Sequence, residues 1–134
     1  MRLPDLLQQD RICIPSLEDV LATVPKGKRL FIEVKCGEQF IAAAAASLQN
    51  RPGKQIVVIG FSLPTMQKVK AAFPELEVCS IVEFKRSLRT ARWSPRPSDV
   101  IAQAKAAGLD GIDAGAKVTF AWLHAAPGCL HGAR

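Results

Sequence analysis

The chain has 134 residues, of which 49% are hydrophobic and 22% charged, a balance that fits one globular domain over residues 1–134. No apolar run reaches the roughly 18 residues that cross a bilayer, and the first residues lack the pattern of an export signal. We therefore expect a cytoplasmic protein without a membrane span.

The net charge is +6, which favours anionic partners. Part of this excess lies in one stretch without acidic residues, which contains Lys85, Arg86, Arg89, Arg92 and Arg96. Basic stretches are usually solvated loops or helix faces, and we favour that interpretation. Nucleic-acid binding is not expected, because few aromatic side chains lie nearby to stack on bases.

The four cysteines are Cys13, Cys36, Cys79 and Cys129. They are widely spaced and form no CxxC pair, so the sequence offers no support for a zinc site. Cys36 and Cys79 lie in apolar runs, which predicts that both are small buried side chains. A reducing compartment is the simpler expectation.

Helix signals and strand signals alternate along the chain. Ser16 is a predicted N-cap, with Asp19 completing an approximate capping box. Ser62 and Ser98 are the predicted caps of two later helices, and Gly108 is a predicted helix terminator. The predicted helices cover residues 16–24, 38–48, 62–73, 98–107 and a segment from Thr119 onward. The predicted strands cover residues 30–36, 56–61, 76–82 and 109–115, with a long connection at 83–97.

Alternation of strands with helices predicts a parallel α/β sheet. About four such units are half of an eight-stranded (β/α) barrel, which takes around 250 residues. The alternatives are an open doubly wound sheet or part of a barrel. The residues alone slightly favour the open sheet, because it needs no further strands.

The strand LFIEVKC, residues 30–36, carries a charge anomaly. Side chains alternate along a strand, so Phe31, Glu33 and Lys35 share one side, and the opposite side is wholly apolar. Buried charges cost several kcal/mol each unless they are paired or bound. One interpretation is an ion pair of Glu33 with Lys35 or an arginine at the rim of the sheet. The other is that Glu33 binds a divalent cation and Lys35 an anion beside it, at the strand end where α/β proteins place their sites.

The next strand ends in Gly60, Phe61 and Ser62. An aromatic side chain before a helix cap could form the wall of a pocket. Taken alone, the pattern favours a core position for Phe61 and a capping role for Ser62.

Three segments together resemble the central part of the glycerophosphodiester phosphodiesterase family: IPSLEDVL (14–21), LFIEVKCG (30–37) and QIVVIGFSLPTMQKVKAAFPELEV (55–78). The resemblance covers about residues 12–82 and continues more loosely over 106–119. It implies a partial (β/α)8 TIM barrel and the hydrolysis of glycerophosphodiesters to glycerol 3-phosphate and an alcohol. It also implies a divalent metal, Mg²⁺ or Ca²⁺, with Glu33 as a metal ligand, Lys35 as a phosphate contact and Phe61 lining the site. Gly60 stands where the family usually has serine.

The family's His-Arg-Gly, Glu-x-Asp and His-Asp motifs do not occur here. The two histidines, His124 and His131, lie near the C-terminus, so the resemblance assigns no catalytic acid or base to this chain. It implies a chain that begins after the third barrel strand and has little activity alone. Open strand edges in such a half barrel would favour self-association. Two alternatives stay open: a non-catalytic module that binds phosphorylated ligands through Lys35 and the basic stretch, or a fragment without a function of its own.

Overall fold

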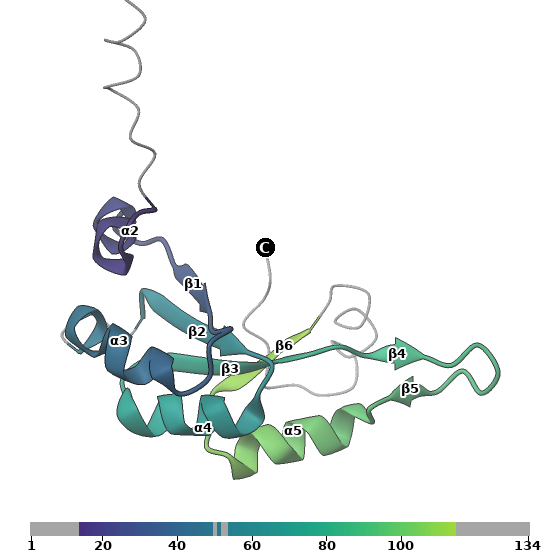
Figure 1. The fold of residues 1–134 in the computed structure, drawn as a ribbon. Coiled ribbons are helices and arrows are strands. Elements are labelled where there is room, and N and C mark those ends of the chain that lie inside the picture. Colours follow the sequence, from purple (N-terminus) through teal and green to yellow (C-terminus); the bar gives the residue numbers. More distant parts are fainter. Residues whose placement is uncertain (1–13, 50, 52–53, 115–134) are drawn as a thin grey trace, which may run out of the picture.

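The computed structural model describes residues 14–49, 51 and 54–114. Four strands form one parallel sheet in the order β1-β2-β3-β6, and helices alternate with them along the chain (Figure 1). The strands are β1 (Leu30–Glu33), β2 (Ile56–Gly60), β3 (Glu77–Val82) and β6 (Gly111–Ala114). The helices are α2 (Leu17–Thr23), α3 (Gln39–Leu48), α4 (Leu63–Ala72) and α5 (Pro97–Ala106). The predicted parallel α/β architecture is therefore confirmed.

The core lies on one side of this sheet. Alternate strand residues such as Ile56, Val58 and Val78 are at most 1% exposed. They belong to one apolar cluster with residues of α3, α4 and α5, including Leu48, Met66, Val69 and Ala104. These three helices lie on the same side of the sheet (Figure 1). Burial of the apolar strand faces against the helices is thus the main stabilisation of the fold.

The other side of the sheet carries the charged residues. Cα register places Phe31 beside Val57 and Val57 beside Glu77, so their side chains share this face. Arg29 forms an ion pair with Glu77, and its guanidinium lies 5.7 Å from the centroid of the Phe31 ring. Phe31 is 56% exposed. Within the described residues, this side has no helix comparable to the three on the core side.

Two of the three predicted helix N-caps are confirmed. Ser16 forms the predicted capping box with Asp19, whose side chain accepts from the Ser16 backbone at 2.9 Å. Ser62 caps α4 as expected. The prediction that Ser98 caps the fourth helix is wrong, because α5 begins at Pro97 with Arg96 as its N-cap. Proline suits the first helical position, since it has a fixed φ and no N–H that needs a partner. Gly108 follows α5 with φ +71°, as predicted for a C′ glycine.

The predicted long connection at 83–97 contains a feature that the sequence did not reveal. Strands β4 (Lys85–Arg86) and β5 (Trp93–Ser94) pair antiparallel and form a hairpin that extends away from the main sheet (Figure 1). The basic residues up to Arg92 are therefore carried by an exposed hairpin and not by a helix face, and Arg96 is the N-cap of α5.

The predicted helix after Thr119, both histidines and the cysteines Cys13 and Cys129 lie outside the described residues. None of the described helices is long and apolar enough to cross a membrane.

Candidate functional site

The candidate site lies where β1 and β2 end. β1 stops at Glu33, three residues earlier than predicted, although the Val34 N–H still donates to the Ile59 carbonyl at 2.8 Å. The chain then turns at Gly37, which has φ +50°. This left-handed backbone suits glycine and leads the chain from the strand into α3.

Lys35 therefore lies on the connection after the strand, yet it stays beside Glu33. Its Nζ atom is 3.6 Å from a Glu33 carboxylate oxygen. The Lys35 side chain is 79% exposed and that of Glu33 is 36% exposed. The pair is thus a solvent-facing ion pair at the rim of the sheet, worth roughly 0–1 kcal/mol in stability. This geometry matches the interpretation as an ion pair at the rim of the sheet. It also leaves the Lys35 ammonium accessible to an anion.

Phe61 follows β2 and lies at the same rim. It is 58% exposed, so the interpretation of Phe61 as a core residue is wrong. The buried strand β2 ends at Gly60, so Phe61 lies past its last residue. Ser62 is its neighbour and caps α4, accepting hydrogen bonds from the Thr65 backbone and hydroxyl at 3.4 and 2.9 Å.

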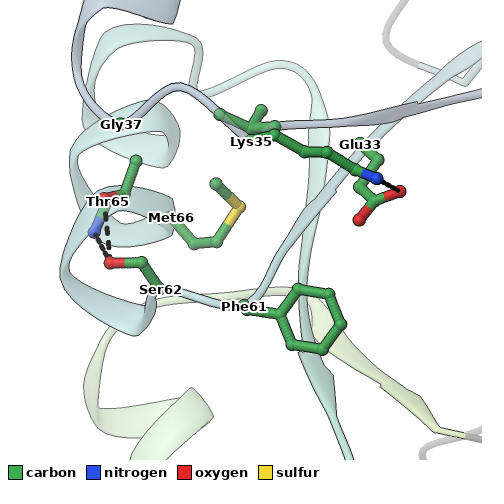
Figure 2. A pocket seen from close by; sticks show the side chains of 8 residues that line it. Glu33, Lys35, Gly37, Phe61, Ser62, Thr65 and Met66 are labelled. Carbon is green, nitrogen blue, oxygen red and sulfur yellow. Dashed lines mark hydrogen bonds and ion pairs between the residues drawn. The ribbon is translucent and has the colours of Figure 1, made fainter.

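These residues surround one hollow of about 380 Å³ (Figure 2). Eight residues from the ends of β1 and β2 and the start of α4 line it: Glu33, Val34, Lys35, Gly37, Phe61, Ser62, Thr65 and Met66. The structure therefore brings together all three residues for which the sequence suggested a binding role, Glu33, Lys35 and Phe61.

Met66 and Gly60 shape the base of the hollow. Met66 is 1% exposed, and a Cβ at Gly60 would lie 2.7 Å from its Cε atom. The Met66 thioether thus fills the space beside β2 that a side chain at position 60 would occupy. Thr65 and Met66 were not identified from the sequence. The predicted cap at Ser62 could have indicated both of them. An N-cap accepts from the residue three positions later, and the first helical turn places residue 66 beside residue 62.

The hollow is suited to an anion more than to a metal ion alone. The first turn of α4 adds little to this, because Pro64 has no N–H and the Thr65 N–H already donates to Ser62, so the exposed Lys35 ammonium is the main positive charge of the hollow. Glu33 is its single carboxylate, and the Lys35 ammonium beside it offsets the negative charge that would attract a cation. In the described residues no group of three or more potential metal ligands is present. These residues by themselves therefore do not fit a resident Mg²⁺ or Ca²⁺ ion, which takes six or more oxygen ligands.

Cys36 and Cys79 have different environments. Cys36 lies past the end of β1 and is exposed, so its predicted burial is wrong. Cys79 lies within β3 and is half-buried. Burial, with a smaller effect of the nearby Glu77 carboxylate, raises the pKa of the Cys79 thiol to about 12. Neither thiol lines the hollow.

Comparisons with protein-family models, with curated proteins and with solved structures give no match to this chain.

Proposed function

We propose that this chain is part of a glycerophosphodiester phosphodiesterase and that Glu33, Lys35 and Phe61 form the phosphate-binding part of its site. One observation carries the proposal. The three residues that the sequence resemblance singles out lie around one hollow at the carboxyl ends of adjacent parallel strands. That rim is where α/β proteins bind their ligands.

The sheet supports the partial-barrel component of this proposal. Its strand order follows the chain, and its core contains α3, α4 and α5 on one side. Right-handed crossovers between successive strands of one direction place all helices on one side, as in a (β/α) barrel. An open doubly wound sheet reverses its strand order and has helices on both sides. About four βα units of a TIM barrel account for this pattern better than a doubly wound sheet.

Each residue around the hollow has a part in binding a glycerophosphodiester. The Lys35 ammonium, which lies beside the Glu33 carboxylate, attracts the phosphate as a point charge. The exposed Phe61 ring offers an apolar surface to the glycerol or alcohol carbons. Hydrolysis also needs an acid and a base, and we assign neither to the described residues, so we expect little or no activity from this chain alone.

In this proposal Glu33 contributes one oxygen ligand to a divalent cation, Mg²⁺ or Ca²⁺. Because the described donors do not complete a metal site, the other ligands have to be oxygens of the bound phosphate, water or groups outside the described residues. Metal and phosphate should therefore bind together more strongly than either binds alone.

Calorimetric titration with glycerol 3-phosphate tests the phosphate contact of Lys35 and the metal contact of Glu33. Lys35→Ala should weaken binding about five- to tenfold, because it removes an exposed charge-assisted contact. Lys26→Ala is the matched control, since Lys26 is an exposed lysine in the turn before β1, at the opposite end of the sheet. If both variants bind as the wild type does, Lys35 is not a phosphate contact.

Glu33→Gln separates metal binding from simple charge neutralisation. With EDTA, removal of the carboxylate should leave phosphate affinity unchanged or raise it, because Lys35 loses its ion-pair partner. With Mg²⁺ or Ca²⁺, the variant should lose the metal-dependent gain in affinity that the wild type shows. An equal metal-dependent gain in both proteins would exclude Glu33 as a ligand.

A second candidate function is a non-catalytic module that binds phosphorylated small molecules. The accessible Lys35 ammonium favours it, because an anion can bind there without acid–base groups. Such a module binds glycerol 3-phosphate without any dependence on metal. A fragment without function shows no saturable binding in either condition.

A further inference from the structure

The basic hairpin, residues 85–96, projects from the rim of the sheet. It consists of β4, the loop, β5 and the two residues that lead into α5. β4 and β5 pair through Lys85 with Ser94 and Arg86 with Trp93. The Ser87 N–H donates to the Arg92 carbonyl and the Ala91 N–H to the Ser87 carbonyl, both at 2.9 Å. The loop between the two strands is thus held by its own backbone hydrogen bonds.

The charge of this hairpin is of one sign. It contains no acidic residue, and all five of its cations are exposed: Lys85, Arg86, Arg89, Arg92 and Arg96. The Arg86 Nε atom donates to the Ala91 carbonyl at 3.3 Å, which directs this guanidinium along the loop. A concentrated positive potential therefore surrounds the loop.

The loop at the end of the hairpin carries one fully exposed apolar side chain. Leu88 lies between Arg86 and Arg89 in the sequence, and its exposed fraction is 103%, so it has no cover from the protein. A leucine in that position contributes nothing to the core, whereas its transfer to an apolar medium would be favourable. An exposed apolar side chain within a basic segment is typical of segments that bind at the lipid–water interface.

We propose that the basic hairpin docks on the surface of an anionic phospholipid membrane. Leu88 enters the boundary between headgroups and acyl chains, and the surrounding cations contact lipid phosphates. Stacking on nucleic-acid bases is disfavoured, because Trp93 is the hairpin's single aromatic residue and is half-buried, lining a hollow with Arg92, Arg96 and Pro97.

The position of the hairpin gives this docking a consequence. β4 follows β3 after two residues, so the hairpin lies at the same rim as the ends of β1 and β2. Docking would bring that rim, with its hollow at Glu33, Lys35 and Phe61, toward the lipid headgroups. The docking itself does not depend on the proposed phosphodiesterase function.

Vesicle flotation of the full chain tests the proposal. The wild type should bind phosphatidylcholine vesicles that contain phosphatidylserine, bind pure phosphatidylcholine vesicles much less, and be released by salt. Arg89→Glu changes the local charge by two units and should weaken binding about 25-fold, at roughly fivefold per charge. Lys26→Glu makes the same charge change at the other end of the sheet and should have a far smaller effect.

Leu88→Ser tests insertion of the leucine without changing the charge, with Ile14→Ser as the matched control. Ile14 is 96% exposed but precedes α2, outside the basic hairpin. Leu88→Ser should weaken vesicle binding about tenfold or more, and Ile14→Ser by much less. Far-ultraviolet circular dichroism confirms that each variant folds.

Three results would overturn the proposal. The first is vesicle binding that does not depend on anionic lipid, and the second is an equal effect of Leu88→Ser and Ile14→Ser. The third is binding of a single-stranded oligonucleotide that exceeds vesicle binding and depends on Arg89 but not on Leu88, which would assign the hairpin to nucleic acid.

Discussion

Asp110 joins the α4–β3 connection to the β6 end of the sheet, and its removal should destabilise the protein. One carboxylate oxygen of Asp110 accepts from the Val78 N–H and lies near the Lys70 Nζ atom, both at 2.8 Å. Lys70 Nζ also donates to the carbonyls of Pro74 and Leu76, at 2.9 and 2.8 Å. Asp110→Ala would therefore leave the amide of a buried strand residue without its acceptor and Lys70 without its counter-ion.

The expected cost is about 2 kcal/mol, because a hydrogen bond to a charged group contributes about 1.5–3 kcal/mol and the ion pair adds little at its exposure. The side chains of Lys70 and Asp110 are 21% and 37% exposed, which is why the ion pair is discounted. For a chain of this size the loss corresponds to a fall of roughly 6–8 °C in melting temperature.

Urea denaturation followed by circular dichroism measures this cost. Asp110→Asn keeps an acceptor for the Val78 amide and should lose about half as much as Asp110→Ala. Glu75→Ala is the control, since Glu75 is an exposed acidic residue in the same region of the chain. A free energy of unfolding for Asp110→Ala within about 0.5 kcal/mol of the wild type would refute the role of this contact.

Three further predictions concern the thiols and the sheet edges. Because the folded-state pKa of Cys79 is raised from 9.0 to about 12, its contribution to stability should be present below about pH 9 and be lost as the pH rises toward 12. Alkaline denaturation should be less steep in Cys79→Ala, and peptide mapping after alkylation at pH 8 should show fast labelling of Cys36 and slow labelling of Cys79. In the described sheet β1 and β6 each have one paired neighbour, which predicts self-association in sedimentation experiments; a concentration-independent monomer would contradict it.

Much of the candidate site could be predicted from local sequence. Glu33 and Lys35 are two residues apart in an extended segment, and that spacing alone placed their side chains together. Ser62 was recognisable as a helix cap because its hydroxyl serves the amide three residues later. Met66 was not recognised, since its place beside Gly60 depends on how α4 packs against β2.

The sequence by itself determined the alternation of strands and helices, the caps at Ser16 and Ser62, and the shared side of Glu33 and Lys35. These depend on side-chain periodicity and on hydrogen bonds between near neighbours. The tertiary structure alone decided the strand order, the side that the helices cover, the exposure of Phe61 and the β4–β5 hairpin. Strand pairing and burial depend on contacts between residues far apart in the chain, and no local pattern specifies those partners.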